Sequence, residues 1–310
     1  MSGELAIDVH GLVKRFGKKT AVAGVDIQLP RGDVWGFLGP NGSGKTTTIR
    51  MICGLLKVTE GSGQCLGYDI QRDAALIRQQ TGYMTQKFSF WSDMTIRENL
   101  EFVARLYRLS HLRETVDQTL EKLGLTDRQN QLAGALSGGW KQRLALAAVT
   151  MHNPKLLLLD EPTAGVDPQA RRDFWDEIHH LSLEGMTVLV STHYMDEAER
   201  CDRIVYLANG HKIIEGTVPD VIERSGLSTF RGEGKGVRRL AEALKGEPGV
   251  DHVAYFGSAL HLSGKDPAAI RAALSRHPTN DVVWNEVRPS LEDAFIALSA
   301  EAGVDTRVHA

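Results

Sequence analysis

The chain has 310 residues, of which 42% are hydrophobic and 24% are charged. This length exceeds one typical domain of roughly 100 to 200 residues, so the sequence predicts two domains. The net charge of -3 lacks the basic excess of most nucleic-acid-binding domains, which argues against nucleic acid as a partner.

Cysteine usage and hydropathy exclude several further classes of protein. Cys53, Cys65 and Cys201 include no CxxC pair, so we expect neither a disulfide framework nor a zinc site. No apolar run approaches the roughly 20 residues that cross a bilayer, and the first residues lack the pattern of a signal peptide. We therefore expect the chain to stay in the cytoplasm.

The first part of the chain is predicted to begin with strands. Residues 5–9 and 25–29 alternate apolar and polar side chains, which predicts half-buried antiparallel strands. Residues 34–38 form a continuous apolar run that leads into glycines, as a buried strand does before a loop and a helix. We expect that helix from residue 45 to about 56, and a mostly helical stretch from about 95 to 123.

Two more short buried strands are predicted at residues 156–159 and 187–190. Between them, Asp167 can cap a helix that begins at Pro168 and ends near Gly185. Strands that alternate with helices imply a largely parallel sheet covered on both faces. The predicted fold class is therefore α/β.

The composition of the sequence changes beyond Gly226. Residues 231–236 are rich in glycine and charge and are interpreted as a linker. Residues 228–299 are then predicted to follow the order strand, helix, strand, strand, helix, strand, with the first helix at 237–244. That order suits a small α+β unit of the ferredoxin-like kind. The predicted domains are residues 1–225 and 226–300, followed by a flexible tail at 301–310.

A phosphate-binding motif lies at residues 39–46. The segment GPNGSGKT fits the pattern G-x-x-x-x-G-K-[ST] between a predicted strand and a predicted helix, which is the context of a P-loop. Backbone N–H groups of such a loop and the N-terminal end of the helix bind phosphate. We expect Lys45 to reach the β- and γ-phosphates and the Thr46 hydroxyl to ligate Mg²⁺. The predicted ATP-binding residues here are Gly39, Pro40, Asn41, Gly42, Ser43, Gly44, Lys45, Thr46 and Thr47.

Two carboxylates, Asp160 and Glu161, end the apolar strand at 156–159. In this topology they face the P-loop at the carboxyl edge of the sheet. Asp160 suits the outer shell of Mg²⁺, reached through water. Glu161 can polarise the attacking water, because an in-line displacement needs a positioned nucleophile more than a strong base. Together the two motifs define a P-loop NTPase only, which binds a nucleoside triphosphate with Mg²⁺.

A third motif narrows the class of NTPase. Residues 136–143, LSGGWKQR, resemble the LSGGQ signature of ABC ATPases. The rest of the family pattern follows in order over residues 5 to about 220: Phe16 at the adenine-stacking position, Gln86 in the Q-loop, Asp167 in the D-loop and His193 in the switch position. The resemblance implies a mostly parallel sheet, an N-terminal antiparallel β subdomain and a helical subdomain.

The resemblance also assigns roles to these residues. It implies that Gln86, Glu161 and His193 serve catalysis, that Thr46, Gln86 and Asp160 surround Mg²⁺, and that Ser137, Gly138 and Gly139 contact ATP. In the family, the signature of one subunit closes on the γ-phosphate held by the P-loop of the other, so a second copy of the chain is an expected partner. Trp140 replaces the family's usual glutamine, which removes one amide side chain but leaves the backbone donors unchanged.

The second partner implied by the resemblance is an integral-membrane permease, which would hold the chain at the inner face of the cell membrane. In the family, the region after the Q-loop contacts the permease. Here that region is residues 86–97, and its aromatic residues Phe88, Phe90 and Trp91 either anchor that interface or fill the core of the helical subdomain.

Export is the expected direction of transport. The segment PSLEDAF at 289–295 resembles the ending of export ATPases of the daunorubicin-resistance and polysaccharide- or lipid-export branch. The resemblance thus implies an ATPase that powers export of a drug, lipid or polysaccharide-like substrate. The alternative is a non-transport ABC ATPase acting on nucleic acid or ribosomes, but the P-loop and the signature are too close for a long coiled-coil insertion and the chain has one cassette. An ATP binder without turnover is disfavoured because Glu161 and His193 are both present.

Overall fold

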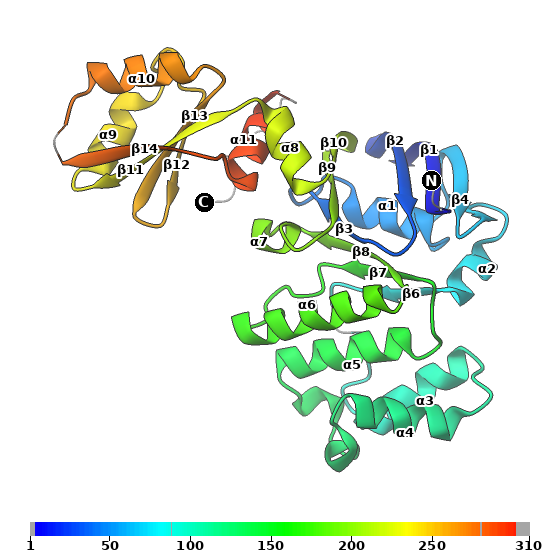
Figure 1. The fold of residues 1–310 in the computed structure, drawn as a ribbon. Helices are drawn as coiled ribbons and strands as arrows, with labels where there is room; N and C mark the ends of the chain where they lie inside the picture. The colour runs from blue at the N-terminus through cyan, green and yellow to red at the C-terminus, as the bar shows by residue number, and fades with distance from the viewer. Residues whose placement is uncertain (1–3, 88, 280, 302–310) are drawn as a thin grey trace. The chain divides into compact units, whose positions relative to one another are not determined.

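The computed structural model describes residues 4–87, 89–279 and 281–301 (Figure 1). The chain divides into two compact units, Met1–Lys212 and Ile213–Ala310. The second unit begins before the expected boundary at residue 225, because helix α8 (Val218–Ser225) packs against helix α11 (Leu291–Glu301) in that unit. Residue 301 of the expected tail ends α11, and the rest of that tail lies outside the described residues.

An antiparallel sheet opens the first unit. Its strands lie in the order β2 (Lys19–Pro30), β1 (Leu5–Phe16), β4 (Glu60–Cys65) and β5 (Tyr68–Asp69). Strands β1 and β2 are longer than predicted and pair as far as Phe16 and Lys19. Several register shifts interrupt their pairing, and a bulge breaks the alternation of apolar and polar side chains from which a strand is predicted.

A central sheet positions the phosphate-binding motifs. Its six strands are, in order across the sheet, β10 (His211–Gly216), β9 (Arg203–Ala208), β3 (Val34–Leu38), β8 (Thr187–Thr192), β7 (Leu156–Asp160) and β6 (Thr81–Met84). Strands β9, β3, β8, β7 and β6 run parallel to one another, as predicted. Strands β7 and β8 continue to the polar residues Asp160 and Thr192, which are buried at the ends of otherwise apolar runs.

Helices begin and end near the predicted positions with two differences. Helix α1 (Lys45–Ile52) stops before residue 56, and Gly54 just beyond it has a left-handed backbone with φ 67°. The stretch at 95–123 contains two helices, α3 (Ile96–Leu106) and α4 (Leu112–Lys122). Arg108 between them also has a positive φ, 55°, which ends a right-handed helix.

The remaining helices of the first unit are α2 (Ala74–Gln79), α5 (Gly138–Thr150), α6 (Pro168–Leu183) and the short α7 (Met195–Ala198). Asp167 caps α6 as predicted, since its side chain accepts hydrogen bonds from the backbone N–H groups of Gln169 and Ala170. Helices α5 and α6 lie side by side (Figure 1). Among the described helices, none combines the length and the apolar character that a membrane span requires.

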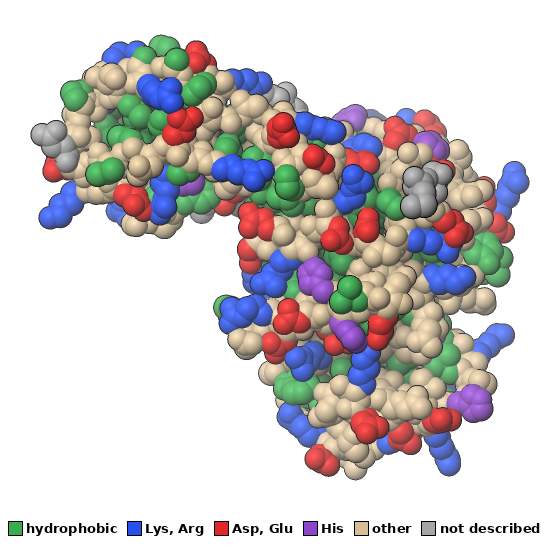
Figure 2. Space-filling view, in the orientation of Figure 1, with side chains coloured by type: hydrophobic (Ala, Val, Ile, Leu, Met, Phe, Trp, Pro, Cys, Tyr) green, Lys and Arg blue, Asp and Glu red, His purple; other side chains and the backbone are tan. Residues whose placement is uncertain are grey.

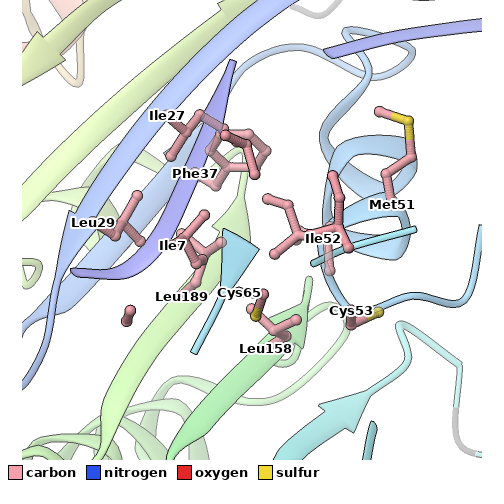
Figure 3. Packing of buried hydrophobic residues seen from close by; sticks show 14 of the residues in the cluster. Ile7, Ile27, Leu29, Phe37, Met51, Ile52, Cys53, Cys65, Leu158 and Leu189 are labelled. Carbon is pink, nitrogen blue, oxygen red and sulfur yellow. The ribbon is translucent and has the colours of Figure 1, made fainter. Parts of the chain in front are cut away.

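An apolar core lies between the antiparallel sheet, helix α1 and the central sheet. Figure 3 shows Ile7 and Ile27 from β1 and β2 facing Phe37, Ile52 and Leu158. All of these side chains are fully buried. A second apolar cluster joins α3, α4 and α5 into the helical subdomain. Packing of α1 against both sheets fixes the P-loop that precedes it.

The second unit has the predicted order of strands and helices. Its elements are β11 (Ser228–Gly234), α9 (Val237–Leu244), β12 (His252–Phe256), β13 (Ala259–Gly264), α10 (Pro267–Arg276), β14 (Val282–Val287) and, with α8, the helix α11. The strands form an antiparallel sheet in the order β12-β13-β11-β14. Each helix between strands crosses over the sheet, as in a split βαβ unit.

The predicted linker at 231–236 is wrong, because most of it belongs to strand β11. Its glycines serve close approach within the sheet. A Cβ atom on Gly232 would lie 2.6 Å from the Trp284 ring, and one on Gly234, with φ 145°, would lie 1.8 Å from the carbonyl oxygen of Asp281. The glycine content of this segment indicated a loop, but the segment is a strand in which two positions must be glycine because neighbouring groups pack closely against the backbone.

Replacing Leu262 with alanine should destabilise the second unit by about 2 to 5 kcal/mol, because the side chain is fully buried among Phe230, Leu244 and Ile270. The matched control Val283→Ala alters an exposed side chain of the same sheet and should change stability by about 0.5 kcal/mol or less. Hydrogen exchange of β11 and β13 amides in the full chain measures both effects. Equal exchange in the two variants would contradict the assigned core.

Candidate functional site

The P-loop joins the end of β3 to the start of α1. Glycines at 39 and 44 are required by close packing: a Cβ atom on Gly39 would lie 2.1 Å from the carbonyl oxygen of Leu207, and one on Gly44 would lie 2.6 Å from that of Ala21. Gly44 also has a φ of 103°, which favours glycine. Packing against neighbouring backbone thus shapes the loop, and the helix that follows presents its N-terminal end to the site.

Lys45 is held inside the P-loop. Its side chain is 4% exposed, and Nζ donates hydrogen bonds to the carbonyl oxygens of Gly39 at 2.6 Å and Pro40 at 3.2 Å. Nζ also lies 3.8 Å from Oε1 of Glu161. Burial lowers the pKa of Lys45, and the negative charges of Glu161 and Asp160 oppose that shift. A cation at this place can neutralise phosphate charge without the large movement of a flexible surface lysine.

Asp160 gathers three hydroxyl groups. Its Oδ1 accepts hydrogen bonds from Thr46 Oγ1 and from Ser191 Oγ, each at 2.8 Å, and Tyr83 OH lies 3.4 Å from Oδ2. The Tyr83 hydroxyl in turn accepts from Arg50 Nε at 3.1 Å. Hydroxyl and carboxylate oxygens are hard ligands of the kind that Mg²⁺ prefers. The adjacent Thr46 and Asp160 therefore fit the predicted Mg²⁺ site.

Glu161 is the point at which the predicted catalytic residues meet. Its Oε2 accepts a hydrogen bond from Gln86 Nε2 at 2.8 Å and lies 3.5 Å from His193 Nδ1. Its backbone has a φ of 47°, a left-handed conformation that costs energy for a residue other than glycine. The Glu161 N–H donates to both the carbonyl oxygen and the hydroxyl of Ser191, at 3.1 and 3.0 Å, and these bonds hold the strained backbone.

The structure thus brings one group of predicted site residues together and leaves another apart. The hydrogen bonds and ion pairs given above join Lys45, Thr46, Gln86, Asp160, Glu161 and His193. Phe16 lies on β1 with its ring 51% exposed, and the Lys14 ammonium is 5.2 Å from the ring centre. Ser137 and Gly138 are exposed at the start of α5. An exposed ring and an exposed helix start are both free to meet a ligand or another chain.

The signature segment is shaped by α6. A Cβ atom on Gly139 would lie 2.6 Å from the Cβ of Ala170, so the close approach of α5 and α6 requires glycine there. Trp140 packs against the apolar core of the helical subdomain. The guanidinium groups of Arg128 and Arg143 lie 5.7 and 5.4 Å from its ring. The indole that replaces the usual glutamine therefore has neighbours of its own within this chain.

Sequence reasoning did not identify Ser191 and Tyr83 as site residues. Both lie on central strands, Ser191 near the end of β8 and Tyr83 on β6. The signal for Ser191 was available, since it is a polar residue directly after the predicted apolar strand 187–190. Tyr83 offered no such signal, because its contact with Asp160 depends on the pairing of β6 with β7.

A strand, a P-loop and a helix facing the acidic end of a neighbouring parallel strand define a P-loop ATPase. Residues 22–164 match the family model for ABC transporters. The chain is 35% identical over 300 residues to the Nod factor export ATP-binding protein I of Rhizobium sp. (strain N33), a match that covers 96% of this chain and 97% of that protein. The chain belongs to the family of ABC transporter ATP-binding proteins.

Other relatives match more than two thirds of the chain's length. The linearmycin resistance ATP-binding protein LnrL of Bacillus subtilis (strain 168) is 39% identical over 227 residues, which cover 72% of this chain and 73% of LnrL. The probable multidrug ABC transporter ATP-binding protein YbhF of Escherichia coli (strain K12) is 44% identical over 225 residues. That match covers 72% of this chain but 39% of YbhF, so the chain spans well under half of that relative.

Solved structures agree with this assignment. The ATP-binding cassette MJ1267 of an ABC transporter, in its ADP conformation, is 31% identical with a TM-score of 0.62 over 69% of this chain and 91% of that one. A dimeric post-hydrolysis structure of the cassette MJ0796 with ADP and phosphate is 27% identical with a TM-score of 0.61, over 68% of this chain and 98% of that one. The predicted ABC ATPase fold is therefore confirmed.

Replacing Ser191 with alanine should slow ATP hydrolysis by about ten- to a hundred-fold, because Asp160 and the Glu161 N–H both lose a buried partner. The control is Ser182→Ala, which removes a hydroxyl outside the site; this hydroxyl donates to the backbone carbonyl oxygen of Gly32 near the end of α6. Phosphate release from ATP measures both variants. A normal rate in Ser191→Ala would show that the hydroxyl does not hold the two carboxylates.

Proposed function

We propose that this chain hydrolyses ATP to drive export through a separate membrane protein. The observation that carries this proposal is the convergence of Gln86, His193 and Lys45 on Glu161, beside the pair Thr46 and Asp160. A buried base with several polar partners at the end of a P-loop sheet is suited to hydrolysis and exceeds what nucleotide binding needs. The proposal therefore includes turnover.

Each side chain has a separate task in this reaction. The P-loop N–H groups and Lys45 bind the phosphates, and Phe16 offers its exposed ring to the adenine. Thr46 and Asp160 would hold Mg²⁺, which neutralises phosphate charge when bound. Glu161 orients and polarises the water that attacks the γ-phosphate, while Gln86 fixes the carboxylate of Glu161. His193, whose Nδ1 lies 3.5 Å from the same carboxylate, would contact the γ-phosphate.

A second copy of the chain is the proposed partner at the nucleotide. Ser137 and Gly138 are exposed, and the hydrogen-bonded group around Glu161 does not include them within the described part of the chain. A phosphate of the twin subunit could dock on the N-terminal end of α5. The solved MJ0796 cassette is a dimer bound to ADP and phosphate, which supports a second copy as the partner. Asp167, which caps α6 close to Gly139, would lie at the same interface.

A membrane permease is the second proposed partner. The aromatic residues after Gln86 differ in burial. Phe90 packs against the core of the helical subdomain, whereas Trp91 is 44% exposed. Phe88 lies outside the described residues. Trp91 meets the exposed Phe102 edge to face, with ring centres 4.3 Å apart, and Leu106 lies one turn further along α3. Exposed aromatic and aliphatic side chains in contact suit a protein interface. This attachment would place the chain at the inner face of the cell membrane.

Export is favoured by relatives whose names record multidrug, linearmycin-resistance and Nod factor export functions. One of them, the Nod factor export ATP-binding protein I, matches nearly the full length of the chain. A drug, lipid or saccharide-like cargo is therefore proposed. Action on nucleic acid or ribosomes is not favoured, since basic and acidic side chains are interspersed on the face in Figure 2 and the net charge is -3.

Lys45→Ala should weaken ATP binding by about ten-fold or more, because a hydrogen bond to a charged group contributes about 1.5 to 3 kcal/mol. Lys57→Ala is the matched control, since it removes an exposed lysine beyond the same helix. Equilibrium binding of a fluorescent ATP analogue to each purified variant provides the measurement. Equal affinities in the two variants would contradict the P-loop assignment.

Glu161→Gln should bind ATP normally and release phosphate about a hundred-fold more slowly or worse, because the amide cannot accept a proton from water. The trapped ATP should also yield a stable dimer by size-exclusion chromatography. The control is Glu184→Gln, an exposed carboxylate at the end of α6. Normal phosphate release by Glu161→Gln would refute the role given to Glu161. The proposed permease is tested by purifying the chain from its native cell and asking whether an integral-membrane protein copurifies with it.

A further inference from the structure

We propose that Glu197 is a positioning residue that holds Glu161 and His193 at their working separation. The proposal rests on ATP hydrolysis at Glu161. Glu197 lies on the short helix α7 and is 1% exposed, although no role in binding phosphate or water falls to it. A carboxylate removed from water needs hydrogen bonds or opposite charges that compensate for its lost hydration. The groups that supply them here indicate its function.

The carboxylate joins two segments that carry the reacting side chains. One oxygen, Oε1, accepts a hydrogen bond from the Thr163 hydroxyl in the loop after β7, and the other, Oε2, accepts one from the Thr192 hydroxyl at 2.6 Å. Thr163 is buried two residues after Glu161, and Thr192 directly precedes His193. The Glu197 carboxylate therefore connects the loop after β7 with the end of β8. The spacing of these two segments sets the distance from Glu161 to His193.

Short hydrogen-bonded turns transmit this constraint to the reacting side chains. The Ala164 N–H donates to the Glu161 carbonyl oxygen at 3.3 Å, which closes a turn that contains Thr163. The Tyr194 N–H donates to Thr192 Oγ1 at 3.0 Å, so the same hydroxyl that reaches Glu197 also brackets His193. The left-handed backbone of Glu161 needs surrounding structure to persist, and the anchored turn supplies part of it.

Arg171 balances the charge of the buried carboxylate. Its Nε lies 3.6 Å from Glu197 Oε1, and its guanidinium lies 4.6 Å from the centre of the Tyr194 ring. Arg171 belongs to α6, the helix that Asp167 caps and that packs against Gly139 of the signature. Glu197 thereby links α6 to both loops of the hydrolytic site. A neutral amide would lose the charge that Arg171 faces and would present a donor to one threonine hydroxyl.

The exposed neighbour Asp196 offers a matched control. Its Oδ2 lies 3.4 Å from Arg171 Nη1, so Asp196→Asn removes one carboxylate charge from the same arginine on the same helix. Neither Thr163 nor Thr192 is among its partners in the contacts of the described chain. Any effect of Glu197→Gln that Asp196→Asn does not share must come from the two threonine hydrogen bonds or from burial.

The test compares ATP affinity and turnover in the full chain. Glu197→Gln should lower kcat by about ten- to a hundred-fold while the Kd for ATP changes by less than about three-fold, since phosphate binding does not pass through the two threonines. Asp196→Asn should have the kcat and the Kd for ATP of the unaltered chain. In a double-mutant cycle with His193→Ala, the losses in kcat should be less than additive, because both changes disable the same unit.

A second pair of variants keeps the proposal falsifiable if Glu197→Gln does not fold. Thr163→Val preserves the shape of the side chain without its hydroxyl and should lower kcat, whereas Thr163→Ser retains the hydroxyl and should recover most of the rate. Normal kcat in both Glu197→Gln and Thr163→Val, or fully additive losses with His193→Ala, would overturn the positioning role. Failure of the unaltered chain to hydrolyse ATP would instead overturn the proposed function.

Discussion

The structure of the site depends on the burial of opposite charges at one edge of the central sheet. Lys45, Asp160 and Glu161 are each less than a tenth exposed, and an isolated buried charge is strongly unfavourable. The ammonium group is therefore satisfied by two P-loop carbonyls and by Glu161, and Asp160 is satisfied by three hydroxyl groups. These contacts fix the side chains that are expected to meet the phosphates. Preorganised groups cost less to align during reaction.

Parallel pairing explains why these residues meet. Strands β3, β8 and β7 are neighbours that run in the same direction, so the P-loop, Ser191 and Asp160 all follow carboxyl ends at the same edge. The register aligns Asp160 with Ser191 and Leu38 with Thr192. A serine at this position can bond both the carboxylate of Asp160 and the backbone of Glu161. The geometry of catalysis is thus a property of the sheet as well as of its loops.

The two halves of the predicted nucleotide site differ in exposure. In the phosphate half, Lys45, Asp160 and Glu161 are buried and bonded to neighbouring groups, whereas Phe16 and the start of α5 face solvent. This difference is expected if adenine and a second subunit complete the site, since each would cover one exposed surface. The role proposed for Glu197 fits the same division. It would keep the buried half in a fixed geometry while α6, which carries Arg171 and packs on Gly139, contacts the half that closes.

The sequence by itself determined the motifs and their order. The P-loop, the acidic strand end and the helix capped by Asp167 depend on neighbours in the chain, and local backbone chemistry sets them. Tertiary structure decided what composition left ambiguous. It placed Gly232 and Gly234 in a strand because Trp284 and the Asp281 backbone pack there, and it joined Glu197 to Thr163 from a distant segment of the chain. Contacts of that kind require the folded chain, because no spacing in the sequence encodes which buried polar groups will meet.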